Sequence, residues 1–323
     1  MTRKLLLLGA GFSRNWGGWL ASEAFEYLLG IDTLDELTRR TLWEYKDRGG
    51  FEDALAVLQR KWVESRSKDA GRRLQAMQDA ILQMFRDMDG AFSATQFEPQ
   101  NHREFMIANF LVRFDAIFTL NQDTLLERHY LNDNVALLSS GHWDSYQIPG
   151  MHRDPGQDRQ PGGSWSPLAR ERFQVHERCQ PLVKLHGSWN WNIDSRQRLL
   201  IMGGDKAREI ESHPILSWNF ELFREYLCKP DTRLMVIGYS FRDEHVDQVI
   251  EDAAVRFGLK LFVVDPLGVD VLNENRNPVA LINAESRRFR QLQSHVVGAS
   301  RRSLMTTFGG DRAEHSKLMR FFK

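Results

Sequence analysis

Four short, almost wholly apolar segments constrain the fold of this chain more than any other feature of its sequence. They are residues 4–8, 116–120, 234–237 and 261–264, and each ends beside a small or polar residue. Such runs are typical of parallel strands that are buried on both faces. A fifth segment, residues 182–185, is interrupted by Lys184 and is a weaker strand candidate.

Helical patterns lie between these segments. Apolar residues recur at steps of three and four from Leu74 to Met88 and from Val246 to Phe257. Strands that alternate with helices predict an α/β fold with a Rossmann-like, doubly wound parallel sheet. In such folds the functional residues gather at the carboxyl ends of the strands.

The chain divides into four regions by composition. Residues 1–22 and 105–270 carry the strands and form the predicted core, whereas residues 23–104 hold only helical patterns and are predicted to be a helical insertion. Residues 149–167 contain eight Pro or Gly in nineteen positions, which predicts a long irregular loop. Residues 271–323 are predicted to be a basic helical segment, for which a solvated face and a docking surface both remain open.

Composition excludes several classes of protein. The 323 residues include 43 Lys plus Arg and 43 Asp plus Glu, so no net field attracts the whole chain to nucleic acid or to a membrane. The two cysteines form no Cys-x-x-Cys pair, which predicts neither a structural zinc site nor a disulfide framework. The initial leucine run is too short for a signal peptide. We therefore expect a cytoplasmic protein that meets nucleic acid only through a partner.

Two strand ends carry glycine turns. The first strand runs into a loop that can approach a phosphate closely and that precedes a helix N-terminus. A hydride-transferring dehydrogenase is disfavoured, because Arg14 stands where the usual redox fingerprint has a third glycine. In the second turn, backbone and hydroxyl groups are candidates for contacting a ribose or phosphate. The candidate cofactor-binding residues of the two loops are Gly9, Ala10, Gly11, Phe12 and Ser13, and Gly238 and Ser240.

Three further strand ends carry polar side chains. Asn121 offers a donor and an acceptor to a water or a sugar, although it or Asp123 could simply cap the next helix. His186 lies beside a glycine and suits proton transfer near neutral pH, although a lone histidine is more often structural. Asp265 is placed to accept hydrogen bonds from ribose hydroxyls.

The order of these motifs resembles the NAD-binding core of sirtuins. GAGFS, TLNQD, HG, GYS and VVDP follow one another as GAG-x-S, T-x-N-x-D, HG, G-T-S and a strand ending in Asn or Asp do in that family. The resemblance implies a sirtuin-like fold in which Asn121 and His186 are catalytic. It also implies that the glycine loops, Asp123 and Asp265 contact NAD.

The chain departs from protein-deacylating sirtuins in three places. It has no zinc cysteines between the HG and GYS segments, no G-I-P-x-F-R loop after GAGFS, and no F-G-E-x-x-P segment for an acyl-lysine peptide. Together with LNQD, KLHGS and GYSFRD, this pattern resembles the sirtuin-like domains of bacterial anti-phage defence. That resemblance implies an NAD hydrolase that depletes cellular NAD, without zinc, as a homo-oligomer or together with a separate HerA-type ATPase or sensor.

The implied reaction breaks the bond between nicotinamide and ribose. In it, Asn121 orients a water and His186 removes its proton, directly or through a ribose hydroxyl. An NAD-dependent protein deacylase or ADP-ribosyltransferase would use the same pocket, and a non-catalytic NAD or ADP-ribose sensor would keep the glycines and Asp265. These alternatives remain open from the sequence.

Overall fold

A seven-stranded sheet forms the centre of the protein. The computed structural model describes residues 2–131, 134–156, 162–193, 198–203, 206–272 and 291–323. The strand order is β11-β10-β9-β1-β2-β6-β3, and every pairing is parallel. The strands are β1 (Arg3–Leu8), β2 (Ala116–Thr119), β3 (Ser145–Gln147), β6 (Cys179–Lys184), β9 (Thr232–Ile237), β10 (Lys260–Val264) and β11 (Val296–Ser300).

The leucines of β1 explain its place in the middle of the sheet. Leu5 and Leu7 belong to the apolar cluster on one face, and Leu6 and Leu8 belong to the cluster on the other. Side chains alternate across a strand, so a run of leucines is stable only where both faces are covered. The sequence prediction of a doubly wound parallel sheet is therefore confirmed.

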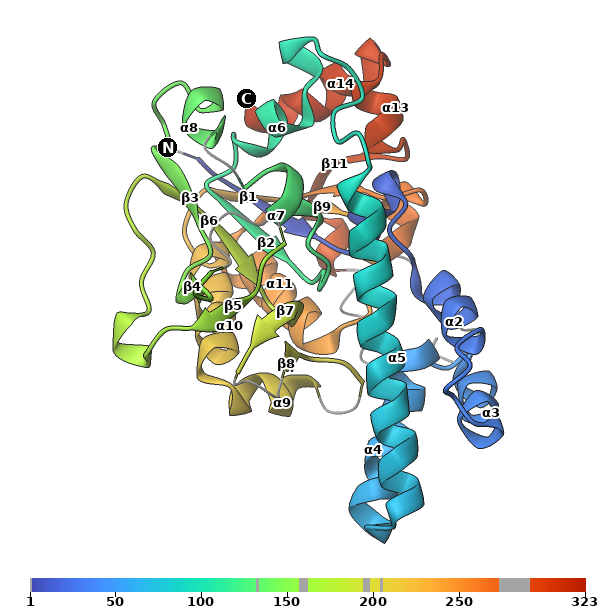
Figure 1. Cartoon of the computed structure of the whole chain (residues 1–323). Helices are drawn as coiled ribbons and strands as arrows, with labels where there is room; N and C mark the ends of the chain where they lie inside the picture. Colours follow the sequence, from blue (N-terminus) through green and yellow to red (C-terminus); the bar gives the residue numbers. More distant parts are fainter. Residues whose placement is uncertain (1, 132–133, 157–161, 194–197, 204–205, 273–290) are drawn as a thin grey trace.

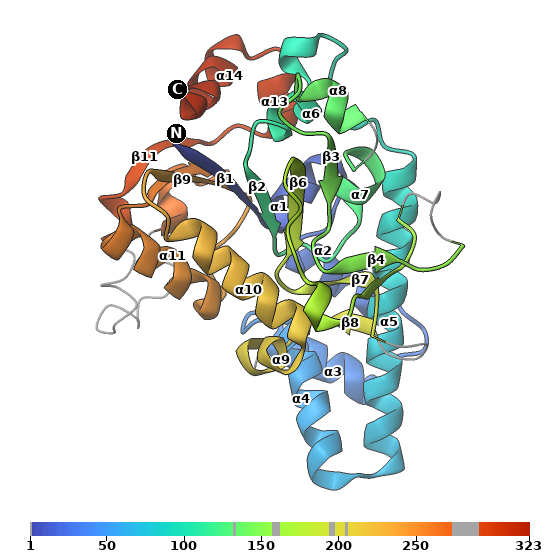
Figure 2. The same ribbon diagram turned by 90° about the vertical axis from the view of Figure 1, so that its left-hand side faces the viewer.

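Helices cover both faces of this sheet (Figures 1 and 2). α10 and α11 contribute most of the helical residues in the apolar cluster on one face, and α2, α4, α5, α6 and α7 contribute to the cluster on the other. The α-helices are α1 (Ala10–Ser13), α2 (Ala21–Leu29), α3 (Glu36–Tyr45), α4 (Gly50–Ser65), α5 (Lys68–Ser93), α6 (Ile107–Leu111), α7 (Leu125–His129), α8 (Asn134–Leu138), α9 (Lys206–Ser212), α10 (Pro214–Leu227), α11 (Glu244–Phe257), α13 (Leu304–Phe308) and α14 (Arg312–Met319).

Residues 21–93 form four helices, α2 to α5, joined by short connections. In Figure 2 the α4–α5 hairpin extends away from the central sheet. Phe51, Leu55 and Leu58 are buried as their spacing predicts, whereas Trp62 is 36% exposed near the end of α4. None of the helices in the described ranges is long and apolar enough to cross a membrane.

A second, four-stranded sheet lies beside the first. Its order is β4-β5-β7-β8, and the β4–β5 and β7–β8 pairs are antiparallel. The sequence predicts an irregular loop over residues 149–167, but both ends of this region form strands that pair with each other. Residues 157–161 of that loop lie outside the described ranges. The strands are β4 (Met151–Arg153), β5 (Trp165–Pro167), β7 (Gly187–Asn192) and β8 (Arg198–Leu200).

The C-terminal region contains a strand that the sequence does not predict. β11 pairs in parallel with β10, and the ring of Phe262 packs against Gly298 where a Cβ would lie 2.5 Å from the ring. Leu304, Phe308 and Leu318 are buried in the core. Of the basic residues predicted to mark this region, those between 273 and 290 lie outside the described residues.

Candidate active site

Strand register aligns five loops at one edge of the sheet. Leu8 lies opposite both Thr119 and Ile237, and these in turn lie opposite Lys184 and Val264. The next residues along each strand therefore leave the sheet at the same edge. The chain leaves β1 towards one face and leaves β9, through α11, towards the other, so the β1–β9 boundary is the switch point where α/β proteins bind ligands.

The glycine loops after β1 and β9 are in direct backbone contact at this boundary. Gly9 donates its N–H to the carbonyl of Ile237 at 3.0 Å, and Gly11 donates to that of Gly238 at 2.9 Å. A Cβ on Gly11 would lie 2.6 Å from the Cα of Gly238, and one on Gly9 would lie 2.5 Å from the Gly238 oxygen. The close approach of the two loops therefore requires glycine at all three positions.

The contact between the two loops uses backbone N–H groups of the first loop that could otherwise bind a phosphate. The N–H groups of Gly9, Gly11 and Phe12 are bonded within the protein, and the Phe12 ring is buried against Trp16 at 5.0 Å. α1 has only four residues, so it supplies little of a helix macrodipole. Ala10 is the exposed residue of the loop. Arg14, at the position of the missing third glycine, pairs with Glu23 at 2.6 Å.

Replacing Gly238 with alanine is expected to destabilise the protein strongly. The φ of Gly238 is +63°, and a Cβ there would lie 2.4 Å from Gly11 and Phe12 backbone atoms. Gly258→Ala is the matched control, because its φ is +73° but its Cβ would meet nothing within 4 Å. The control should cost about 1–2 kcal/mol for backbone conformation alone. Urea unfolding should show a larger loss for Gly238→Ala, and equal losses would contradict the steric argument.

Three predicted site residues form one hydrogen-bonded group. Ser13 Oγ donates to Asp123 Oδ2 at 2.7 Å and accepts from Asn121 Nδ2 at 3.0 Å. Asp123 also accepts the N–H of Leu125, the first residue of α7, at 3.0 Å, although the N-cap position itself is Thr124. Ser13 and Asp123 are buried, and Asn121 is half-buried. The group therefore fixes the Asn121 amide at the end of β2.

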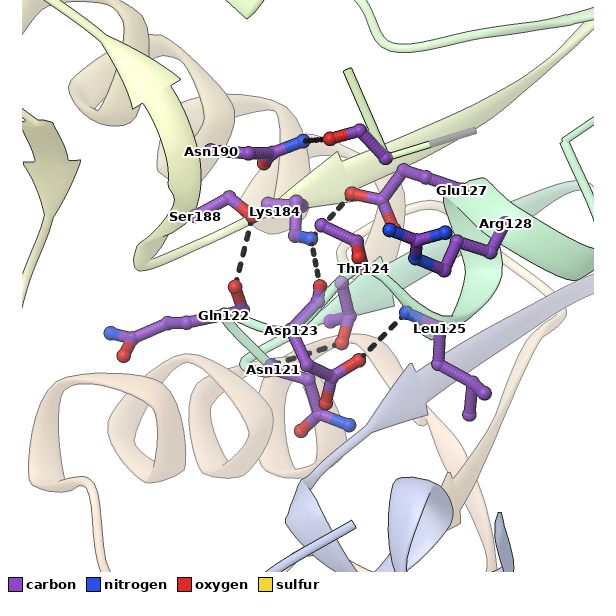
Figure 3. A network of polar contacts seen from close by, with 12 residues as sticks. Asn121, Gln122, Asp123, Thr124, Leu125, Glu127, Arg128, Lys184, Ser188 and Asn190 are labelled. Atoms are coloured by element: carbon purple, nitrogen blue, oxygen red, sulfur yellow. Dashed lines mark hydrogen bonds and ion pairs between the residues drawn. The ribbon is translucent and has the colours of Figure 1, made fainter. Parts of the chain in front are cut away.

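A buried lysine lies behind this group (Figure 3). Lys184 is 1% exposed and donates to the Asp123 carbonyl and to the Glu127 carboxylate, each at 2.5 Å. Burial raises the pKa values of the Asp123 and Glu127 carboxyls, and the charge of Lys184 opposes both shifts. The residue that weakened the strand prediction is thus the cation that stabilises the loop after β2.

The helical insertion reaches the same network through Asp89 of α5. Arg128 donates from Nε to Asp89 Oδ1 at 2.6 Å and makes a second bond to Oδ2, and the Thr124 hydroxyl also donates to Asp89. Asp89 is 5% exposed. These bonds tie α5 to the segment that carries Asn121, a link that sequence spacing does not reveal.

His186 lies in the turn from β6 to β7 and contacts a second histidine. Its Nε2 is 2.9 Å from Nε2 of His245, the second residue of α11. Burial lowers the pKa of His186 to about 3; nearby Asp243 opposes this shift, and Lys206 and His245 add to it. Lys206 itself bridges Asp243 and Glu52 of α4, each at 2.7 Å. His186 is therefore a neutral imidazole at neutral pH.

Gln122 connects the asparagine group with the histidine turn. Its carbonyl accepts the Ser188 hydroxyl at 3.0 Å and the Trp189 N–H at 3.1 Å, and its side-chain amide donates to the carbonyls of Ile201 and His186. No direct hydrogen bond between Asn121 and His186 is present among the residues described. The two predicted catalytic residues thus lie on adjacent loops that are bonded to each other.

The remaining predicted residues lie on the β9 and β10 side. Ser240 is exposed, and its turn is held by the Tyr239 hydroxyl, which donates to Asp247 at 2.7 Å and accepts the Asp243 N–H at 3.1 Å. Asp265 is half-buried, and its Oδ1 accepts the Leu267 N–H at 2.9 Å. Neither residue bonds to the Asn121 group in the part of the chain that is described.

The buried His186 predicts a pH dependence of stability. The unfolded chain protonates this imidazole below its ordinary pKa of 6.5, but the folded protein does so only near pH 3. Between these values unfolding takes up a proton, so the free energy of unfolding falls as pH is lowered, by up to about 1.4 kcal/mol per pH unit. Urea unfolding from about pH 6.5 to 4.5 should show a shallower slope in His186→Asn. An unchanged slope would argue against a neutral His186.

The sheet and the polar residues at its carboxyl edge define a Rossmann-like α/β protein. A sequence profile described as SIR2-like domain matches residues 115–287, which is more than half of the chain. The chain therefore belongs to the SIR2-like domain family, which indicates an NAD-related activity. The GAGFS loop and the helical insertion precede the match. A search of curated proteins finds no matching relative. Within the described ranges, no cluster of three or more His, Cys, Asp or Glu is placed to hold a metal ion.

Proposed function

We propose that this protein is an NAD⁺ hydrolase that cleaves the nicotinamide–ribose bond to give nicotinamide and ADP-ribose. The observation that carries the proposal is the placement of a fixed asparagine amide and a neutral histidine on two bonded loops at the carboxyl edge of the sheet. Family membership supplies the NAD-related class of substrate.

The residues at this edge suit the charges of the reaction. Cleavage develops positive charge on the ribose. Ser13 links Asn121 directly to the Asp123 carboxyl. When it is ionised, this carboxyl stabilises positive charge nearby. Asn121 Nδ2 is occupied by Ser13, so its Oδ1 is the atom assigned to the attacking water. Ala10, Ser240 and Asp265 are the exposed or half-buried groups assigned to the phosphate and adenosine side.

The proposed step balances without a further reactant. The bond between ribose C1′ and the nicotinamide nitrogen breaks, with its electron pair leaving on neutral nicotinamide. The water oxygen bonds to C1′, and its proton passes to the imidazole of His186 and then to solvent. A weakly basic imidazole suffices, because the water proton becomes strongly acidic once its oxygen bonds to C1′. The low pKa also keeps His186 unprotonated before each turnover.

Product analysis tests this proposal against its rivals. The full chain is incubated with NAD⁺, and nicotinamide, ADP-ribose and acylated ADP-ribose are measured, with and without an acylated peptide. Nicotinamide with free ADP-ribose supports the hydrolase. Acylated ADP-ribose that requires the peptide identifies a deacylase, a modified protein identifies an ADP-ribosyltransferase, and NAD binding without any product identifies a sensor.

We further propose that the hydrolase is a cytoplasmic, NAD-depleting effector of anti-phage defence. The sequence motifs LNQD, KLHGS and GYSFRD support this role, because they resemble those of the sirtuin-like domains of anti-phage defence. Such an enzyme must be inactive before infection, so we assign its control to a homo-oligomer or to a separate HerA-type ATPase or sensor. A monomer by light scattering that hydrolyses NAD⁺ at full rate alone would overturn this assignment.

A further inference from the structure

His245 contacts the His186 imidazole, and the family motifs give this second histidine no role. It lies 59 residues further along the chain, near the start of α11. The two rings are 5.1 Å apart between centroids, and the Phe220 ring of α10 lies 5.3 Å from the His245 ring. The pair is therefore held from both the β6–β7 turn and the helices on one face of the sheet.

The contact between the two Nε2 atoms determines where the protons lie. A neutral imidazole carries one N–H and one lone pair, so a hydrogen bond at 2.9 Å needs a proton on one Nε2 and a lone pair on the other. If His186 is the donor, its Nδ1 keeps the lone pair that a base requires. If His186 is the acceptor, Nδ1 carries the proton and cannot take another.

Burial favours the neutral form of both rings, although charged groups of both signs lie nearby. Asp243 precedes α11 and Glu244 is its first residue. Lys206 of α9 forms ion pairs with both Asp243 and Glu52 of α4. Burial lowers the pKa of His245, with Lys206 adding to the shift and Asp243 and Glu244 opposing it. His245 is half-buried, whereas His186 is 3% exposed.

We propose that His245 is a positioning residue for His186: it accepts the His186 Nε2–H at its own Nε2 and so holds the His186 Nδ1 lone pair ready for the water proton. The inference rests on the proposed hydrolase function. The histidine pair thus resembles other catalytic pairs in which a partner on the far nitrogen fixes the tautomer of the base. When His186 takes the proton at Nδ1, the bond to His245 stabilises the resulting cation.

Two substitutions separate the hydrogen bond from packing. His245→Gln keeps an acceptor, whereas His245→Phe keeps the ring volume and loses it. We expect His245→Phe to lower the kcat of nicotinamide release about 10–100-fold with little change in KM, and His245→Gln to retain most of the activity. His142→Gln is the control, because His142 is an exposed histidine near Asp115, at the opposite edge of the sheet. Thermal unfolding confirms that each variant is folded.

Nitrogen-15 NMR of the histidine rings provides a readout that is independent of turnover. We expect the Nε2–H tautomer at His186 in the wild-type protein and a mixture of tautomers in His245→Phe. A Nδ1–H tautomer at His186, or wild-type kcat in a folded His245→Phe, would overturn this inference while leaving the hydrolase intact. A wild-type protein that yields no nicotinamide overturns the proposed function itself, and this inference with it.

Discussion

Replacing Asn121 or His186 with alanine is expected to lower the kcat of nicotinamide release by about 100-fold or more. His186→Ala removes the imidazole that takes the water proton. Asn121→Ala removes the amide that Ser13 holds at 3.0 Å, so the attacking water loses its orientation. The measurement is steady-state nicotinamide release over a range of NAD⁺ concentrations, which separates kcat from KM.

Two further variants make this result specific. Ser13→Ala leaves Asn121 in place but removes its partner, so we expect a smaller loss of kcat than in Asn121→Ala. Asn101→Ala alters an exposed asparagine and should leave nicotinamide release unchanged. Turnover that survives both Asn121→Ala and His186→Ala in folded protein would refute the assignment of these residues.

The parts of the fold that follow from local pattern were predictable from the sequence. β1, β2, β9 and β10 are apolar runs buried on both faces, and such runs have few other stable environments. The sequence does not predict β11, because this strand is only partly buried, contains Gly298 and lies in a basic region. Its packing against the ring of Phe262 joins residues that are far apart in the sequence. β4, β5 and β8 have three residues each, too few for any periodicity to be visible.

The candidate site was predictable only where a residue follows a strand. Asn121, Asp123, His186, Gly238 and Asp265 all do, and a parallel sheet brings such positions to one edge. The partners of these residues come from distant segments, so spacing says nothing about them: His245 pairs with His186, and Asp89 of the insertion pairs with Arg128. The sequence points to the glycines of these loops as phosphate-binding residues. The structure shows that they are required first for the close contact between the two loops.

Lys184 interrupts an otherwise apolar segment of the sequence. Its substitution is expected to cause the largest loss of stability. A lysine in an apolar strand must have a partner, because an isolated buried charge is very unfavourable. Glu127 is that partner, from the helix that follows β2. An ionisable residue inside an otherwise apolar strand therefore indicates a buried partner of opposite charge.

Lys184→Met is expected to lower the free energy of unfolding by about 3–5 kcal/mol, because it removes the cation that forms an ion pair with the buried Glu127 carboxylate. Lys229→Met removes the cation of an exposed pair with Glu225 and should cost only about 0–1 kcal/mol. The double variant Lys184→Met with Glu127→Leu should recover part of the loss, since Glu127 then places no charge in the core, although the buried Asp123 carboxyl still lacks the Lys184 cation. Urea unfolding at constant pH measures the free energy of unfolding of the wild type and of these three variants.

The pH dependence of the Lys184→Met variant distinguishes a buried charge from a packing defect. Burial already raises the pKa of Glu127, and removing Lys184 takes away the main cation that opposes that shift. The folded variant then binds a proton at Glu127 at a higher pH than the unfolded chain does, so its free energy of unfolding falls as pH rises through the folded pKa. Lowering the pH should therefore narrow its deficit relative to wild type. A deficit that is independent of pH would mean that Lys184 stabilises the strand by packing alone.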